Sequence, residues 1–305
     1  MDIQYQKFKS LTLKQMAYAM AAADAGNVSA AARKLHVSQP AISAAIAALE
    51  QHYALKLFVR LPAKGVSLTP FGIKVMSEAR LLFDHAQTVA MLATPDAEIS
   101  GEVGISCYAA IAPYVLPRLL RRLEERLPAV SIRLTETDLE GTAASLRQGG
   151  SDLAITYDLG LEKNTYKQAL YAMQPHVICS SQHKFAQLKT IKLARLHRQK
   201  LILLDQPLSA QYVLGLLKAR QAEPEIVWSV KSFELQRSLV ANDFGIALAH
   251  TLPKTKLSYD GLPICSIPIS DNMIEQRVLV TCQEQNRSRP VLKSILEELT
   301  TLFSE

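Results

Sequence analysis

The stretch VSAAARKLHVSQPAISAAIAAL, residues 28–49, predicts two short helices joined by a tight turn at residues 36–37. Ser29 is placed to cap the first helix, and Ser38 is placed to accept a hydrogen bond from a free N–H group at the start of the second. Pro40 falls in the first turn of the second helix, where a missing N–H donor costs little. The pattern therefore predicts a helix-turn-helix.

The second helix has two contrasting faces. Apolar residues recur at helical spacing and predict one buried stripe, which consists of Ile42, Ala45, Ile46 and Leu49. The opposite face carries small or uncharged residues, namely Gln39, Pro40, Ser43, Ala44 and Ala47. A slim, uncharged face is suited to the major groove of DNA, which is wide enough to admit a helix. An ordinary helical hairpin with alanine-rich packing is the alternative, and this stretch alone does not decide between them.

The flanking residues favour the DNA-binding interpretation. Thr12 and Gln15 form a capping box for a preceding helix that stops near Gly26, and a basic turn follows at residues 60–67. Three helices and a basic turn are the plan of a winged helix-turn-helix. The ordered motifs AAA (30–32), SQPAIS (38–43), LE (49–50), LF (57–58), Arg60 and LTPFG (68–72) resemble the N-terminal domain of the LysR-type transcriptional regulators. The resemblance covers about the first ninety residues and extends more loosely over the rest.

This resemblance implies an α/β protein with two parts. The N-terminal part would be an all-α winged helix-turn-helix (residues 1–69) with a long linker helix (70–93), followed by a hinge (94–100). The C-terminal part (101–305) would be a two-lobed α/β domain of the periplasmic-binding-protein type. Lobe I would comprise residues 101–167 and 273–305, lobe II residues 176–261, and the crossovers residues 168–175 and 262–272.

The expected DNA contacts are of two kinds. Arg60 and Lys64 are placed on the wing to meet phosphates, although solvated loop charges are the alternative. The full set of expected DNA-contacting residues is Ser29, Ser38, Gln39, Pro40, Ser43, Arg60, Lys64 and Thr69. Family members often carry Arg, Lys or Gln on the outer face of the recognition helix, whereas alanines at 44, 45 and 47 occupy that region here. We therefore expect few base-edge hydrogen bonds and a large contribution from DNA shape.

Charge and length agree with two functions in one chain. A length of 305 residues suits two or three domains. Residues 1–92 carry 10 Lys and Arg against 5 Asp and Glu, whereas the remainder carries 24 against 23. A basic N-terminal part is expected to face phosphates. The start of the chain lacks an apolar signal segment, and no apolar run is long enough to span a bilayer, so we expect a cytoplasmic protein without a membrane partner.

The four cysteines, Cys107, Cys179, Cys265 and Cys282, are widely spaced and include no Cys-x-x-Cys pair. Zinc spacing is absent, and we expect buried apolar thiols, with a redox-sensing pair as the alternative. The sequence predicts no metal site and no cofactor.

A long helix is predicted from Pro70, because Thr69-Pro70 is a favourable start. Apolar residues recur along it over several turns, at Phe71, Val75, Leu82, Ala86 and Val89, with Ala79 nearby. Such a stripe predicts a self-association seam, and packing on its own domain is the alternative. The resemblance implies that this helix pairs two subunits, and that the protein assembles as a homotetramer, a dimer of dimers.

From residue 101 the pattern alternates between strands and helices, which predicts parallel sheets covered by helices. Strands are expected at 103–105, 130–134, 152–156, 177–179, 201–204, 226–230, 245–249, 264–269 and 277–282. Helices are expected at 113–127, 139–148, 209–221, 233–241 and 290–303.

Ligands of open parallel sheets lie beyond the carboxyl ends of the strands, against helix N-termini that can hold a carboxylate. Residues at such ends are the expected effector contacts: Ser106, Cys107, Tyr108, Tyr157, Pro207, Leu208, Ser209, Phe233 and His250. Taken singly, each has a structural alternative, since the serines, Ser232 included, are good helix caps and the rings are good fillers. The apolar character of Cys107 and Tyr108 leaves an aromatic or heterocyclic effector open beside a small organic acid.

Motifs of common enzymes are missing, including Gly-x-Ser-x-Gly, the P-loop and His-Glu-x-x-His. The expected protein is therefore no enzyme but an effector-controlled, sequence-specific transcription regulator. Its partners would be double-stranded promoter DNA, a small-molecule effector, further copies of itself and RNA polymerase. A solute-binding protein and an enzyme with an accessory DNA-binding segment are the rivals, and salt-sensitive DNA binding separates the first interpretation from both.

Overall fold

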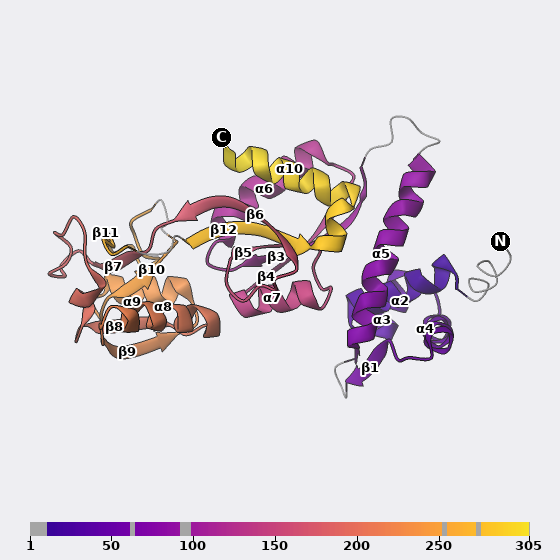
Figure 1. The fold of residues 1–305 in the computed structure, drawn as a ribbon, viewed down its shortest axis with the longest axis horizontal. Helices are drawn as coiled ribbons and strands as arrows, with labels where there is room; N and C mark the ends of the chain where they lie inside the picture. The colour runs from indigo at the N-terminus through magenta and orange to yellow at the C-terminus, as the bar shows by residue number, and fades with distance from the viewer. Residues whose placement is uncertain (1–10, 62–64, 92–98, 252–254, 273–275, 305) are drawn as a thin grey trace.

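The computed structural model describes residues 11–61, 65–91, 99–251, 255–272 and 276–304. Figure 1 shows a small helical domain, one long helix beside it, and a two-lobed α/β part farther along the chain. This agrees with the predicted fold class. No helix in the described ranges is both long enough and apolar enough to cross a membrane.

The small domain contains α2 (Leu13–Ala25), α3 (Val28–Lys34), α4 (Gln39–Tyr53) and a hairpin of β1 (Phe58–Leu61) and β2 (Gly65–Leu68). The predicted capping box at Thr12 and Gln15 is present, and α2 ends at Gly26 in the left-handed conformation. Three helices and a two-stranded wing confirm the predicted winged helix-turn-helix.

The cap of α3 differs from the prediction. Asn27 is the N-cap, and its side-chain oxygen accepts hydrogen bonds from the backbone N–H groups of Ser29 (2.8 Å) and Ala30 (3.1 Å). Ser29 therefore lies inside the first turn of α3 as an exposed residue. Ser38 does cap α4 as predicted, since its hydroxyl oxygen accepts from the N–H of Ala41.

Contacts with the helices hold the wing. The N–H of Val66 donates to the carbonyl of Gly26 (2.8 Å), and a Cβ on Gly65 would lie 2.2 Å from that same oxygen. Gly65 also has a φ of 90°, which disfavours any L side chain. The close approach of β2 to the end of α2 therefore requires glycine at position 65.

The long helix α5 spans Pro70–Met91. Its first half packs against α2, with Met76 and Ala79 buried and Phe71 and Val75 partly buried in the same cluster. The first half of the predicted seam therefore packs on its own domain, which was the alternative, and is not available for self-association. Farther along, Leu82 (43% exposed) and Val89 (67%) remain open.

Lobe I is built on a five-stranded sheet of order β4-β3-β5-β12-β6. Its strands are β3 (Gly101–Tyr108), β4 (Val130–Thr137), β5 (Leu153–Tyr157), β6 (Thr165–Met173) and β12 (Gln276–Gln283). β3 runs parallel to β4 and β5, and β12 is antiparallel to β5 and β6. The covering helices are α6 (Ala112–Arg126), α7 (Leu139–Arg147) and α10 (Pro290–Ser304), with a 3-10 turn, η2 (Glu284–Ser288), before α10.

Lobe II contains two small sheets joined by a single parallel bridge between Leu201 and Ile246. One has the order β10-β7-β11, formed by β7 (His176–Ser180), β10 (Ala247–Ala249) and β11 (Ile264–Pro268). The other pairs β8 (Lys200–Leu204) in parallel with β9 (Glu225–Val230). The helices are α8 (Pro207–Ala219) and α9 (Phe233–Ala241), with a 3-10 turn, η1 (Leu193–Leu196).

The chain crosses between the lobes at points that differ from the predicted ones. Residues 168–173 belong to β6 of lobe I, and residues 264–268 form β11 of lobe II. The first passage therefore lies near residues 174–175, and the second begins after β11 at residue 269. They lie side by side, since the N–H of Ile269 donates to the carbonyl of Pro175 (3.3 Å). The predicted hinge at 94–100 lies mostly outside the described residues.

Candidate DNA-binding face and effector pocket

The outer face of α4 is open to solvent within the subunit. Ser38, Gln39, Pro40 and Ser43 are exposed, as are Ala44 and Ala47. On the opposite side Ile42 and Leu49 are fully buried, Ala45 is 7% exposed and Ile46 is partly buried. The predicted two-faced helix is therefore present, but Ala45 belongs to its inner face only.

The wing lies beside this helix. Arg60 is exposed near the end of β1, whereas Lys64 lies outside the described residues. Thr69 is partly buried: its hydroxyl donates to the carbonyl of Lys56 (2.7 Å) and its oxygen accepts from the N–H of Gly72 (2.9 Å). The structure thus gives Thr69 the role of a cap that fixes the start of α5.

Glu50 connects α4 to the wing, which the sequence reasoning did not predict. Its Oε1 atom accepts from the N–H groups of Leu57 (2.9 Å) and Phe58 (3.3 Å), and its Oε2 atom pairs with Lys56 (2.6 Å). Although partial burial alone would raise the pKa of Glu50, the ammonium of Lys56 and the two backbone donors outweigh burial and lower it.

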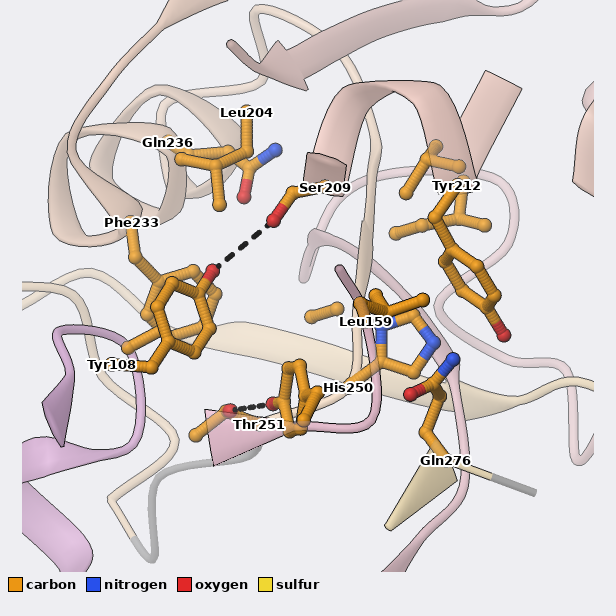
Figure 2. A pocket seen from close by; sticks show the side chains of 15 residues that line it. Tyr108, Leu159, Leu204, Ser209, Tyr212, Phe233, Gln236, His250, Thr251 and Gln276 are labelled. Carbon is orange, nitrogen blue, oxygen red and sulfur yellow. Dashed lines mark hydrogen bonds between the residues drawn. The ribbon is translucent and has the colours of Figure 1, made fainter. Parts of the chain in front are cut away.

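A pocket lies between the lobes, at the carboxyl ends of β3 and β5 and the N-terminal turns of α8 and α9 (Figure 2). Tyr108 and Tyr157 come from lobe I, and their rings meet edge to face at 5.4 Å. Lobe II contributes Ser209, Tyr212, Phe233, Gln236 and His250. Thr251 and Gln276 are buried and also line the pocket. In this arrangement the pocket is partly open to solvent, and the centres of water-sized groups have about 40 Å³ within it.

Two hydrogen bonds connect side chains around the pocket (Figure 2). The hydroxyls of Tyr108 and Ser209 lie 3.4 Å apart across the lobes, and those of Tyr157 and Thr251 lie 2.7 Å apart. Burial, opposed by these bonds, raises the pKa values of both tyrosines. Both side chains therefore keep their hydroxyl proton and are neutral at physiological pH.

His250 and Gln236 supply polar atoms without a partner. The Nε2 atom of His250 and the Oε1 atom of Gln236 are buried and make no hydrogen bond within the described chain. Burial, with a smaller effect of His176, lowers the pKa of His250 to about 4, so its ring is uncharged near neutrality. Since a buried polar atom without a partner is costly, these two atoms are available to a polar ligand.

Four of the predicted effector residues lie elsewhere. Ser106 is fully buried and its hydroxyl lies 3.0 Å from that of Ser151, while Cys107 is fully buried in the core of lobe I. Pro207 starts α8, and Leu208 packs against lobe I beside Gly160, where a Cβ would lie 2.5 Å from the leucine side chain. Tyr108, Tyr157, Ser209, Phe233 and His250 are brought together as predicted.

The main residues that the sequence reasoning missed lie one helical turn from predicted ones. Tyr212 follows Ser209 by three positions on α8, and Gln236 follows Phe233 by three positions on α9. Residues three apart share a helix face, so this spacing could have revealed them.

Charged side chains are missing from the described part of the pocket lining. The polar groups are hydroxyls, amides and one neutral imidazole, among aromatic and aliphatic side chains. Such a lining suits a small ligand that carries a ring and a few hydrogen-bonding groups.

The fold and these two sites define a class: a DNA-binding domain joined to a two-lobed ligand-binding domain. Residues 13–73 match the bacterial regulatory helix-turn-helix family of the LysR type, and residues 96–304 match the LysR substrate binding domain. The chain therefore belongs to the LysR family of transcriptional regulators. It is a DNA-binding regulator with an effector-binding domain and not an enzyme.

Similar proteins span nearly the whole chain. The HTH-type transcriptional regulator TfdS of Cupriavidus pinatubonensis is 27% identical over 292 residues, which cover 94% of this chain and 97% of that protein. The hydrogen peroxide-inducible genes activator of Dickeya chrysanthemi is 25% identical and covers 85% of both chains.

Solved structures agree in fold. HinK, a LysR family transcriptional regulator from Pseudomonas aeruginosa, has a TM-score of 0.62 at 26% identity and covers 96% of this chain and 98% of its own. A full-length OxyR variant, also from Pseudomonas aeruginosa, has a TM-score of 0.76 at 22% identity. The match covers 96% of this chain and 97% of that one, and it bears on the fold alone.

Proposed function

We propose that this protein is a cytoplasmic regulator that binds double-stranded promoter DNA through the outer face of α4. A small molecule that bears a ring, or a small organic acid, binds between the lobes and controls it. The single observation that carries the proposal is the exposed, uncharged face of α4 on a basic domain, in the same chain as a pocket between two hinged lobes.

Direct base contacts fall to Gln39 and Ser43, with Ser38 beside them, because the other exposed residues of the helix between positions 39 and 47 are proline and alanine. An amide side chain is suited to adenine and a methyl group to the thymine methyl group. Ser29, Arg60 and Lys64 would meet phosphates. Sequence preference then depends largely on how readily the DNA adopts the bound shape.

Self-association would use the outer half of α5. Leu82 and Val89 lie seven residues apart and are both exposed, a spacing of two helical turns that suits a helix pair. We infer a dimer through this seam and, from the family resemblance, a homotetramer in which RNA polymerase is a further partner. A protein with Leu82→Asp and Val89→Asp should have a lower mass by light scattering, whereas an unchanged mass would contradict the seam.

The pocket favours a ring over a bare carboxylate. Tyr108, Tyr157 and Phe233 present aromatic surface from both lobes, and the acceptor oxygen of Gln236 needs a donor. The N-terminus of α8 could also bind a carboxylate, because the first N–H groups of a helix have no partner within the helix and can donate to an anion. Phenol and benzoate, one neutral and one anionic with the same ring, separate these two possibilities.

The test has two arms on the purified full chain. In the first, binding to duplexes selected from a random pool should weaken steeply with salt, by the release of counterions. In the second, phenol or benzoate should raise the melting temperature of the wild type, as binding to the folded state requires, but not that of Tyr157→Ala. Salt-independent or absent duplex binding would refute the DNA-binding part. Ring compounds that stabilise the variant equally would refute the pocket.

A further inference from the structure

One arginine lies buried where the linker helix meets lobe I. The side chain of Arg289 is 4% exposed, and it pairs through Nε with Asp84 of α5 and through Nη1 with Asp152 of lobe I. One cation thus lies between two carboxylates. Both carboxylates are more than 130 residues away from Arg289 in the sequence.

The lobe I side of this network is rigidly fixed. One carboxylate oxygen of Asp152 accepts from the N–H of Gly104 (2.8 Å), and the N–H of Asp152 donates to the carbonyl of Gly104 (2.8 Å). Arg289 itself stands between η2 and α10, and its N–H donates to the carbonyl of Asn286. The guanidinium is therefore held by lobe I and offers its remaining edge to the linker helix.

A second contact follows the same face of α5. The amide of Gln285 donates to the hydroxyl of Ser77 at 2.6 Å. Ser77 and Asp84 are seven residues apart on α5, two turns or about 10 Å, and thus share a face. A further contact with lobe I comes from α3, where Lys34 pairs with Glu102 at 3.3 Å; it is exposed and contributes little. In the described ranges the junction is therefore polar, and it holds a buried charged contact at Arg289.

The network lies before the start of β5 and midway along β3, the two strands whose carboxyl ends carry the pocket. Gly104 precedes Tyr108 by four residues in β3, and Asp152 precedes Tyr157 by five residues at the start of β5. At about 3.3 Å per residue the two sites are about 13–17 Å apart along continuous, parallel strands. A tilt of these strands when the pocket is filled would move Asp152 and Arg289 against α5.

Burial disfavours the charged form of Asp84, and the ion pair with Arg289 does not fully offset this effect. Desolvation raises the pKa of Asp84, and the neighbouring Asp152 adds to this effect, while Arg289 lowers it. An ion pair of this kind adds little net stability compared with a fully apolar contact. The pair nevertheless favours the observed arrangement, because a displaced α5 would take the carboxylate of Asp84 away from Arg289.

We propose that Arg289 is a positioning residue that docks the linker helix onto lobe I, and that the state of the pocket reaches the DNA-binding domain through this contact. The transmission from the pocket to the DNA-binding domain rests on the proposed effector function, whereas the docking of the linker helix onto lobe I does not. Arg289 is not among the residues that line the pocket, and it lies in lobe I rather than on the face of α4.

Asp84 is the right residue to change. Replacing Arg289 would leave Asp152 buried without its partner and risk unfolding lobe I. Asp84→Asn removes the negative charge on the linker side of the network and leaves Asp152 with Arg289, Asp84→Glu keeps the charge, and Glu298→Gln is the matched control. That control breaks a similar arginine pair, Arg122 with Glu298, inside lobe I.

The first readout is hydrogen exchange of the full chain without any added compound. We expect Asp84→Asn to exchange at least about tenfold faster than the wild type over residues 284–292, and Asp84→Glu and Glu298→Gln to stay within about threefold there. Wild-type protection in Asp84→Asn would overturn the docking. This outcome does not depend on any effector or on DNA.

The second readout is the change in affinity for the selected duplex on addition of phenol or benzoate. Coupling of ordinary size changes affinity about 5–150-fold. In Asp84→Asn this change should fall below about twofold while the Kd of the compound without DNA stays within about threefold, and Asp84→Glu should restore it. If the compound changes the duplex affinity of Asp84→Asn as much as it changes that of the wild type, the proposed coupling is wrong. A wild type that responds to neither compound would count against the proposed effector class, and the exchange result would still decide the docking.

Discussion

Glu50 provides a quantitative test of how the wing is held. In Glu50→Ala the N–H groups of Leu57 and Phe58 lose their acceptor, and Leu57 is fully buried. A buried donor without a partner costs about 1–3 kcal/mol, and the bond to Phe58 is longer and less buried. We therefore expect the free energy of unfolding of the DNA-binding domain to fall by about 2–4 kcal/mol.

Glu50→Gln is the matched control. Its amide oxygen still accepts from both N–H groups, and only the pair with Lys56 is lost, whose side chain is 78% exposed. Exposed pairs contribute about 0–1 kcal/mol, so this variant should stay within about 1 kcal/mol of the wild type. The comparison isolates the backbone acceptor from the charge.

The assay uses two probes in one urea titration. The single tryptophan, Trp228, lies in lobe II, so its fluorescence reports on that lobe, whereas circular dichroism also reports α2 to α5. Glu50→Ala should unfold in two steps, an early loss of helix and a later, unshifted fluorescence change. A single transition like that of the wild type, or an equal loss in Glu50→Gln, would refute the reasoning.

Acid gives an independent check of the same contact. The pKa of Glu50 is lowered below its ordinary 4.5, so the charged form stabilises the fold at any pH above that value. This stabilisation is lost as the pH falls through the lower pKa of the folded state. The free energies of unfolding of the wild type and of Glu50→Gln therefore differ by a charge-dependent amount. We expect this amount to be constant near neutrality and to vanish in strong acid.

Three further predictions concern the two binding sites. Gln39→Ala should lose discrimination at one or two base pairs of the selected duplex, each by about 1–3 kcal/mol, in a binding series over duplex variants; an unchanged preference would contradict the proposed readout. Arg60→Ala should weaken binding to all duplexes alike and reduce the slope of log K against log salt by about 1, whereas a loss confined to one sequence would mean a base contact. Titration of His250, whose pKa is about 4, should leave binding of phenol unchanged from pH 5.5 to 8, and a step near pH 6.5 would show that the ring charges in the pocket.

Local sequence patterns predicted the elements well where one physical effect dominates. The capping box at Thr12, the cap at Ser38 and the buried stripe around Ile42 follow from spacing alone. The cap at Ser29 was wrong because Asn27 is an equally good cap two residues earlier. Since α2 ends at Gly26, Asn27 is the first residue that can start the next helix, and this depends on where the previous helix stops.

Strand β6 was missed for a different reason. It is the edge strand of the lobe I sheet, pairs only with β12, and among its residues only Leu170 is buried. A strand of this kind has a weak apolar pattern, so residues 168–175 looked like a connection. The crossover had to be placed by strand pairing, which a single sequence does not contain.

The pocket could be predicted in outline because strand ends and helix starts converge in such folds. Which side chain of each end faces the ligand depends on strand register. Tyr108 ends β3 and reaches the pocket, whereas Ser106 and Cys107 are still inside the sheet, one bonded to Ser151 and the other packed in the core. A one-residue difference in where a strand ends changes which side chain is available.

The same strands explain how one domain can serve two distant partners. Tyr108 and Tyr157 stand at the carboxyl ends of β3 and β5, whereas Gly104 lies midway along β3 and Asp152 directly precedes β5. Because these parallel strands are hydrogen-bonded along their shared length, they tilt together more easily than they bend. A ligand that moves the two tyrosines therefore acts on the far end of the strands, where Arg289 meets the linker helix.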